Sequence, residues 1–316
     1  MARSVSEITL GIDVAKDELV IYEWNTEQTT TLANQPTKIA AWLKGVYGPV
    51  RLAVEPTSSY HLELVQQAQA AGWTVYPVNP RQLAHYRLAV GERHKTDATD
   101  AALLARYLAH EADSLRPFKP LDAKAQRLWA LLKRRAIVVS MRQQLQQSFR
   151  DLPVNTQAPR GQLQCLIAHL EQLIRTLIAE LGWQADYHRC LSIPGIGAIN
   201  AAALTAVFHR GTFAGSDAFV AFIGLDVRLR ESGKFKGQSK LSKCGEPEIR
   251  RLLYCAAQAS RSYPLFAAYH QQQLDKGLCK IAAAVVLARK IARIAFSLLS
   301  RQQSFKKKQS DYCKTP

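Results

Sequence analysis

The sequence has little of what marks a membrane-spanning or exported protein. Its most apolar late stretch, residues 281–287, stops before Arg289 and Lys290, far short of the roughly 20 apolar residues that cross a bilayer. Residues 1–4 open no apolar signal core, and we find no basic amphipathic helix at the N-terminus and no lipidation motif. We therefore expect no membrane partner.

Cysteine and histidine are few and poorly spaced for metal binding. None of the six cysteines forms a C-x-x-C pair, and the eight histidines show no metal-ligand spacing. These absences argue against a zinc site and against a disulfide framework. We expect a protein of a reducing cytoplasm.

Acidic residues are in the minority. The 316 residues include 25 Asp and Glu against 42 Lys and Arg, which gives a net charge of +17. This excess favours a polyanionic partner, and nucleic acid fits better than a membrane surface because the lipid-binding signals are missing. A hydrophobic content of 47% is ample for a core, and the length predicts two domains or one domain with a long insertion.

Four of the acidic residues stand where they can meet. Asp13 and Glu55 each end a short apolar run, and Asp97 and Asp100 lie three positions apart where a helical pattern opens. Carboxylates brought close together repel and raise one another's pKa. A divalent cation that prefers hard oxygen ligands, Mg²⁺ or Mn²⁺, relieves this repulsion, so the pattern predicts a metal site.

The first hundred residues have the order of elements that such a site needs. We predict strands over 6–13, 17–24, 29–32, 50–54 and 73–78, and helices over 36–46, 58–71, 81–88 and 97–110. Three antiparallel strands followed by alternating helices and strands make the ribonuclease H-like α/β arrangement. Each acid taken singly also fits a turn or helix-opening position, so the interpretation depends on all four together.

Residues 115–186 have a different character. Prolines 117 and 120 mark a linker, a helical pattern runs over 123–152, residues 153–161 break it, and a near-heptad pattern follows over 162–181. We predict an antiparallel helical hairpin whose apolar stripe serves packing or dimerisation. Its basic face, which includes Arg134 and Arg135, is either a solvated surface or a nucleic-acid contact.

The last third of the sequence contains two stretches suited to binding phosphate groups. Residues 194–197 read Pro-Gly-Ile-Gly and open a helix, as in a helix-hairpin-helix, where the amides of Gly195 and Gly197 would approach a DNA backbone. An ordinary tight turn is the other interpretation. Residues 224–245 form a loop rich in Gly, Ser and Lys that leads into a helix from Glu246, and a final amphipathic helix is predicted over 281–299.

Several segments resemble the DEDD-type insertion-sequence transposases, the family of the Piv-like DNA invertases and the bridge-RNA-guided recombinases. The N-terminal segments are Gly11-Ile12-Asp13-Val14-Ala15-Lys16, Glu55-Pro56-Thr57-Ser58-Ser59-Tyr60, Val78-Asn79-Pro80 and Lys95-Thr96-Asp97-Ala98-Thr99-Asp100-Ala101. Leu241-Ser242-Lys243-Cys244-Gly245 resembles the family's C-terminal serine segment. The sequence departs from the family at Ser58, where Gly is frequent, and at Glu246, where Asn is common.

The resemblance implies three domains: a RuvC-like catalytic domain over 1–115, a helical hairpin or coiled coil for dimerisation over 116–186, and a mainly α transposase domain over 187–316. It implies that Asp13, Glu55, Asp97 and Asp100 hold Mg²⁺ and that Ser242 is the nucleophile, in cis or in trans. Ser232 and Ser239 compete for that role as ordinary loop serines. We expect nucleic-acid contacts at these residues: Lys95, Arg134, Arg135, Gly195, Gly197, Lys234, Lys240 and Lys243.

The activity implied is that of a transposase or site-specific recombinase that moves an insertion sequence. Its partners would be target and donor DNA, a guide RNA from the element's noncoding end, and further copies of the chain in a dimer or tetramer associated with the nucleoid. Three other hypotheses stay open: a junction-resolving nuclease that uses metal-activated water, a non-enzymatic nucleic-acid-binding protein, and, more remotely, a sugar-kinase-type ATPase, which the lack of later Gly-rich phosphate loops disfavours.

Overall fold

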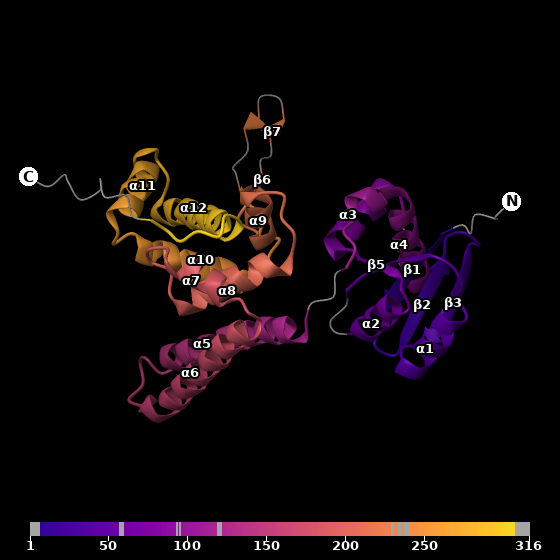
Figure 1. Cartoon of the computed structure of the whole chain (residues 1–316), viewed down its shortest axis with the longest axis horizontal. Coiled ribbons are helices and arrows are strands. Elements are labelled where there is room, and N and C mark those ends of the chain that lie inside the picture. The colour runs from indigo at the N-terminus through magenta and orange to yellow at the C-terminus, as the bar shows by residue number, and fades with distance from the viewer. Residues whose placement is uncertain are drawn as a thin grey trace, which may run out of the picture. The chain divides into compact units, whose positions relative to one another are not determined.

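The computed structural model describes residues 7–56, 60–92, 94, 96–118, 122–228, 231–232, 235–236 and 240–306. The chain divides into two compact units, Met1–Pro120 and Leu121–Pro316 (Figure 1). Each is described on its own.

The first unit is built on a five-stranded sheet in the order β3-β2-β1-β4-β5. β1 pairs antiparallel with β2, β2 pairs antiparallel with β3, and the later strands run parallel to β1. The predicted antiparallel start is thus present, and the two later strands that follow the predicted helices add to the sheet in parallel. The strands are β1 (Ile8–Val14), β2 (Glu18–Glu23), β3 (Gln28–Ala33), β4 (Val50–Val54) and β5 (Thr74–Pro77).

Helices cover both faces of this sheet, because its central strands are apolar on both sides. On one face Ile12 and Val54 pack with Ile39 of α1 and Leu64 of α2. On the other, Ala53 packs with residues of α3 and α4. This mixed α/β unit is compatible with a ribonuclease H-like domain. The helices are α1 (Pro36–Lys44), α2 (Leu62–Ala70), α3 (Pro80–Ala89) and α4 (Asp97–Glu111), followed by the 3-10 turn η1 (Ala112–Ser114).

The second unit is mainly helical. Its helices are α5 (Ala123–Ser148), α6 (Gln157–Glu180), α7 (Gln184–Leu191), α8 (Ala198–Arg210), α9 (Ser216–Ile223), α10 (Pro247–Ser260), α11 (Pro264–Asp275) and α12 (Lys280–Ser300). Four two-residue strands lie between α9 and α10: β6 (Val227–Arg228), β7 (Glu231–Ser232), β8 (Phe235–Lys236) and β9 (Lys240–Leu241). They form two antiparallel pairs, β6 with β9 and β7 with β8.

Helices α5 and α6 lie side by side as an antiparallel hairpin (Figure 1). Their cross-helix pairs fix the direction, since Lys124 contacts Glu180 near one end and Arg135 contacts Glu171 further along. One hydrophobic core runs from the hairpin into the rest of the unit and includes Leu128 of α5, Phe219 of α9 and Ile291 of α12. The hairpin predicted over 116–186 therefore shares its core with the residues that follow it.

The structure differs from the sequence-based expectations at several boundaries. The break predicted over 153–161 is shorter, because α6 already begins at Gln157. Pro159 is the third residue of that helix, where its missing amide has no intrahelical partner to lose. α7, α9, α11 and the four short strands were not predicted. The strands have two residues each and α7 and α9 have eight, so these elements carry little periodicity. Among the described residues no helix combines the length and the apolarity needed to cross a membrane.

Candidate active site

The first two predicted acids lie at the same edge of the sheet. β1 and β4 run parallel, and Ile12 pairs with Val54 in their register. Asp13 is the next residue of β1, and Glu55 follows the last residue of β4. Because neighbouring parallel strands end at one edge, the fold places these two carboxylates beside each other.

The other two acids come from the first turn of α4. The side chain of Thr96 accepts a hydrogen bond from the amide of Thr99 at 3.2 Å, and the Thr96 amide donates to the Thr99 hydroxyl at 2.9 Å. This capping box fixes the start of α4 at Asp97. Asp97 is exposed, whereas Asp100, one turn further on, is buried.

Gly11 lets α4 cross β1 at close range. A Cβ atom at Gly11 would lie 2.1 Å from the carbonyl oxygen of Ala101 and 2.3 Å from the amide nitrogen of Ala105. No side chain fits in that space, so the backbones of β1 and α4 touch. This contact lies one to two turns from Asp97 and brings the acids of α4 towards Asp13.

The charges of the other three acids act on Asp13. The pKa of Asp13 is raised to about 6, first by burial and then by the negative charges of Asp97, Asp100 and Glu55. A hydrogen bond from the backbone of Val14 opposes the rise. The carboxylate of Asp13 is thus repelled by the other three predicted acids.

Arg87 is a residue of this site that sequence reasoning missed. Its Nη2 atom lies 2.6 Å from Oδ1 of Asp100, and both side chains are largely buried. Its Nη1 atom also donates to the carbonyl oxygen of His94 at 3.3 Å. Arg87 stands near the end of α3, 13 residues before Asp100, and no local pattern links the two.

The donor set fits a divalent cation in its chemistry. Within the described parts of the chain, no three Asp, Glu, His or Cys side chains are close enough together to hold one metal ion. Coulomb repulsion acts over longer distances than a metal–ligand bond. Carboxylates too far apart to share one ion can therefore still raise the pKa of Asp13. Carboxylates that repel one another, one of them already paired with a guanidinium, form a site that stabilises added positive charge.

Ser242 lies in the second unit, directly after β9. Its hydroxyl donates a hydrogen bond to Oδ1 of Asp226, and its amide donates to the carbonyl oxygen of Asp226 at 2.9 Å. The serine is 8% exposed. Asp226 was not among the predicted site residues, because it stands 16 positions before Ser242 and no local pattern links the two.

Two glycines pack the chain around Ser242 tightly. Gly224 has φ 78°, and a Cβ there would lie 2.5 Å from the amide nitrogen of Gly245. A Cβ at Gly245 would lie 2.3 Å from the carbonyl oxygen of Ile223. Arg250 binds the same two segments through the carbonyl oxygens of Gly245 at 2.6 Å and Ile223 at 3.3 Å. The serine is therefore held on a close-packed double turn.

The predicted lysines and rival serines divide into two groups. Lys240 and Lys243 are exposed on either side of the Leu241–Ser242 pair, and Lys243 adopts a left-handed φ of 54°. Lys95, Lys234 and Ser239 lie outside the described residues, and for Ser232 only the backbone, in β7, is described.

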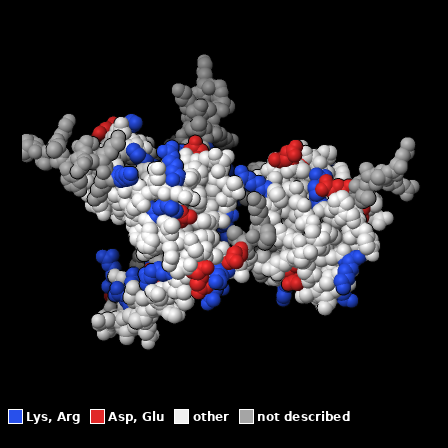
Figure 2. Space-filling model, viewed as in Figure 1, with Lys and Arg blue, Asp and Glu red and all other residues white. Residues whose placement is uncertain are grey.

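The two predicted arginines of the hairpin have different surroundings. Arg134 is exposed and makes no ion pair with any residue that the structure describes. Arg135 is paired with Glu171 of α6, with its Nη2 atom 2.7 Å from Oε1 and its Nε atom 2.8 Å from the same oxygen. Figure 2 shows further Lys and Arg side chains at several places on the visible face of the second unit.

The Pro-Gly-Ile-Gly turn has one glycine explained by packing and one that is open. Gly195 has φ 86°, and a Cβ there would lie 2.2 Å from the hydroxyl oxygen of Ser260. Ser260 in turn donates to the carbonyl oxygen of Pro194 at 2.8 Å. Gly197 is exposed and precedes α8, whose N-terminus has no side-chain cap. The absence of a side chain at Gly195 is thus explained by packing, whereas Gly197 stands in open space at the start of α8.

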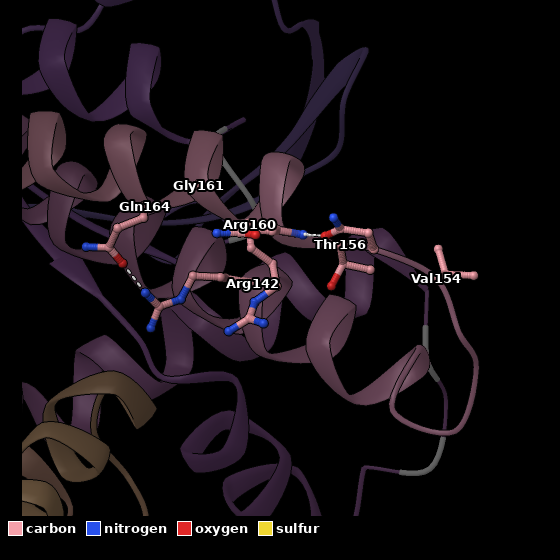
Figure 3. Close-up of a pocket in the computed structure, with 8 residues that line it drawn as sticks. Arg142, Val154, Thr156, Arg160, Gly161 and Gln164 are labelled. Carbon is pink, nitrogen blue, oxygen red and sulfur yellow. Dashed lines mark hydrogen bonds between the residues drawn. The ribbon is translucent and has the colours of Figure 1, made fainter.

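A polar pocket lies at the tip of the helical hairpin. Arg142 of α5 and Gln164 of α6 point toward each other across it and are hydrogen-bonded (Figure 3). Arg160 donates to Gln146 at 3.0 Å. No acidic side chain is among the lining residues, which are Arg142, Val154, Asn155, Thr156, Gln157, Arg160, Gly161 and Gln164.

Two family models match the chain. A transposase model of the DEDD, IS110 type matches residues 10–152, and a model of the transposase IS116/IS110/IS902 family matches residues 187–271. The first span contains the four acids, and the second contains Asp226 and Ser242.

Curated relatives agree with these models. The chain is 27% identical over 325 residues to the pilin gene-inverting proteins of Moraxella lacunata and Moraxella bovis, across 96% of this chain and 99% of each relative. It is 30% identical over 153 residues to a probable family 20 transposase of Pseudomonas aeruginosa, across 46% of this chain and 45% of that protein.

Proposed function

The chain belongs to the IS110-type transposase family and is a DNA recombinase, and on that premise we propose that it cuts and rejoins the DNA of an insertion sequence with four carboxylates and one serine. The observation that carries this proposal is the raised pKa of Asp13. Burial raises it first, and the negative charges of Asp97 and Asp100 on α4 and of Glu55 after β4 raise it further. Structural carboxylates are seldom gathered in this way, since their repulsion destabilises the fold.

The first unit supplies the metal-binding part of the proposed site. Asp13, Glu55, Asp97 and Asp100 would hold Mg²⁺ or Mn²⁺ in a RuvC-like domain. Such an ion, when bound, neutralises charge that develops on a phosphate under attack. Without it, four carboxylates would repel the DNA backbone, so the acids alone do not make a phosphodiester site.

The second unit supplies the proposed nucleophile. The hydroxyl of Ser242 attacks the scissile phosphate and forms a phosphoserine link to DNA, which keeps the energy of the phosphodiester for rejoining. Its place on a rigid double turn supports the role, because a nucleophile gains from being held in one position. Ser242 could work in cis, with the acids of its own chain, or in trans, with those of another copy, and the chemistry is the same in both cases.

The proposed division of labour follows the three parts of the sequence. Residues 1–115 carry the metal site, residues 116–186 join two copies of the chain, and residues 187–316 carry the serine and a helix-hairpin-helix-like contact to DNA. Backbone phosphates would meet the described residues Arg134, Gly197, Lys240 and Lys243, and also Lys95 and Lys234. The net charge of +17 supports extensive phosphate contact.

We further propose that a guide RNA from the noncoding end of the element selects target and donor DNA. Backbone contacts do not read base sequence, so a separate reader is needed. Rewriting the target-pairing loop of that RNA should redirect insertion to the matching DNA. If the insertion site stays the same after the loop is rewritten, RNA guidance is wrong, while the cleavage chemistry remains open.

The test of the central proposal is a denaturing gel of end-labelled duplex DNA from the boundary of the chain's own element. The reaction contains the RNA transcribed from that element and Mg²⁺. Ser242→Ala should bind this DNA like the parent yet form no cut strand and no protein–DNA adduct, whereas Ser232→Ala and Ser239→Ala should form both. If Ser242→Ala cuts at the parent rate and no variant gives an adduct, water is the nucleophile and the chain acts as a junction nuclease.

A further inference from the structure

Asp226 and Ser242 are held together by a small antiparallel ribbon. Val227 of β6 pairs with Leu241 of β9, so Asp226, one residue before β6, and Ser242, one residue after β9, emerge side by side. The Ser242 amide donates to the Asp226 carbonyl oxygen at 2.9 Å, and its hydroxyl donates to the Asp226 carboxylate. Backbone and side chain therefore both join the two residues.

The backbone of this turn does not need the side-chain contact. Beyond the Ser242 amide bond, the amide of Lys243 donates to the carbonyl oxygen of Gly224 at 3.2 Å. Arg250 joins the two segments again through the carbonyl oxygens of Gly245 and Ile223. Because several bonds already hold the turn, the bond from the hydroxyl to the carboxylate is free to serve the chemistry of the serine.

The carboxylate of Asp226 is not used by a salt bridge among the described residues. Two described arginines of this turn are engaged elsewhere: Arg228 donates to the sulfur of Cys244 at 3.0 Å, and Arg250 donates to backbone carbonyl oxygens. Asp226 is half-buried, and its carboxylate accepts the hydrogen bond of the Ser242 hydroxyl. The charge of Asp226 also acts on Arg289, but no ion pair joins these two residues in the described structure.

We propose that Asp226 takes the proton from Ser242 when Ser242 attacks the scissile phosphodiester. This inference rests on the proposed function of Ser242. As the Oγ–P bond forms and the bond from phosphorus to one deoxyribose oxygen breaks, the hydroxyl proton passes to Oδ1 of Asp226. The deoxyribose oxygen leaves with the bonding electron pair as an alkoxide, which takes a proton from solvent water. Rejoining reverses each step: the DNA hydroxyl gives its proton back to solvent and its oxygen attacks phosphorus, while the serine oxygen leaves and takes the proton from Asp226.

The step suits the geometry because proton transfer requires a hydrogen bond that already exists. A serine hydroxyl is a weak nucleophile on its own, and a positioned base contributes roughly 10²–10⁴-fold to the rate of such attacks. Asp226 contacts the reacting oxygen itself, which makes it a catalytic residue in this scheme rather than a remote support.

The deciding variant is Asp226→Asn. The Asn amide oxygen can still accept the serine hydrogen bond at nearly the same size, but it cannot take up the proton. Asp226→Glu keeps a carboxylate on a longer stem. The matched control is Asp217→Asn, which also removes one negative charge from the second unit, at an exposed pair with Arg293. Adduct formation on the labelled boundary duplex is followed in single-turnover reactions, with DNA affinity and Tm measured for each protein.

We expect Asp226→Asn to slow adduct formation roughly 10²–10⁴-fold with DNA affinity and Tm unchanged, Asp226→Glu to recover part of the rate, and Asp217→Asn to match the parent. If Ser242→Ala abolishes the adduct but Asp226→Asn keeps more than half of the parent rate, Asp226 only accepts a structural hydrogen bond and the inference is overturned alone. The inference is also overturned if Asp226→Asn has a low Tm and a stably folded Asp226→Glu protein recovers none of the rate of adduct formation. If the parent never forms an adduct, the proposed function fails first and takes the inference with it.

Discussion

Arg87 Nη2 lies 2.6 Å from Asp100 Oδ1, and both side chains are more than four-fifths buried, at 16% and 12% exposed. One of the four acids of the first unit is therefore already neutralised by a cation that the chain itself provides. The ion pair joins α3 to α4. Arg87 also donates to the carbonyl oxygen of His94, two residues before Thr96, and so contacts the segment between the two helices. A divalent ion that uses Asp100 competes with this guanidinium, which links metal binding to the packing of α3 on α4.

The first prediction concerns Arg87→Gln. In EDTA this variant should be less stable than the parent by about 1–3 kcal/mol, because it leaves the buried carboxylate of Asp100 without its charged partner. Added Mn²⁺ should then raise its Tm by more than it raises the Tm of the parent, because no guanidinium competes for Asp100. Differential scanning calorimetry across a Mn²⁺ titration measures both effects.

Arg81→Gln is the matched control for Arg87→Gln, because Arg81 lies on the same helix and is exposed. It should leave both the Tm in EDTA and the response to Mn²⁺ at the parent values. Equal gains in Tm on Mn²⁺ for the parent and for Arg87→Gln would show that Asp100 takes no part in holding the ion.

The second prediction is a pH dependence of stability in the metal-free protein. The folded state holds the Asp13 proton up to a pKa of about 6, whereas the unfolded chain releases it near 3.8. The unfolded state therefore binds fewer protons between these values, so the contribution of Asp13 to the free energy of unfolding falls as pH rises from about 4 to about 6. Asp13→Asn removes the charge, so in EDTA at pH 7.5 it should melt at a higher temperature than the parent.

The comparison at low pH provides the check on Asp13. At pH 4 the parent also has Asp13 protonated, so the difference in Tm between parent and Asp13→Asn should disappear. The same substitution should weaken Mn²⁺ binding at pH 7.5, seen by calorimetric titration. A variant that is less stable than the parent at both pH values would mean that Asp13 forms a favourable ionic contact in the folded state.

The sequence predicts where the four acids stand in the fold when neighbouring elements determine their positions, while their role as a metal site stays a prediction. Asp13 and Glu55 follow apolar runs that become parallel strands in register, and a local pattern is enough to place them together. Asp97 and Asp100 follow a capping box that is equally local. The approach of α4 to β1 depends on a single glycine whose role is only visible once the backbones are seen to touch.

The residues that sequence reasoning missed depend on packing between distant segments. Arg87 meets Asp100 because α3 and α4 lie together, and Asp226 meets Ser242 through strands only two residues long. Neither relationship leaves a periodic or motif-like trace. Arg135 belongs to a basic run in the sequence, and its ion pair with Glu171 of the other helix is likewise invisible in the local pattern.

The third prediction tests the contact between β1 and α4. Gly11→Ala would place a methyl group 2.1 Å from the backbone of Ala101, so the two elements must separate. Overpacking of this kind costs about 1–3 kcal/mol or more, and the acids of α4 should move away from Asp13. We expect a lower Tm and weaker Mn²⁺ binding in the same protein.

The control for Gly11→Ala is Gly161→Ala. Gly161 lies in α6 with nothing within 4 Å of the added Cβ, so alanine should stabilise the protein by up to about 1 kcal/mol through its better helix propensity. Mn²⁺ binding should not change. A Gly11→Ala protein with parent-like Tm and metal affinity would show that α4 tolerates a wider separation from β1 than the structure allows.

The last prediction separates two adjacent arginines of α5. Arg134 is exposed and unpaired among the described residues, whereas Arg135 is bound to Glu171. If Arg134 contacts a phosphate, Arg134→Ala should weaken nucleic-acid binding and reduce the slope of log K against log salt concentration by about 1, because one fewer counterion is released. Its free energy of unfolding should stay within about 0.5 kcal/mol of the parent value.

Arg135→Ala should instead leave Glu171 half-buried without a partner. This variant should lose about 1–3 kcal/mol of stability, with the salt slope unchanged. Fluorescence anisotropy of labelled duplex DNA at a series of salt concentrations, together with thermal melts, measures both quantities for both variants. If both variants keep the salt slope of the parent, this face of the hairpin is a solvated surface. If both reduce the salt slope equally, the Arg135–Glu171 pair opens when nucleic acid binds.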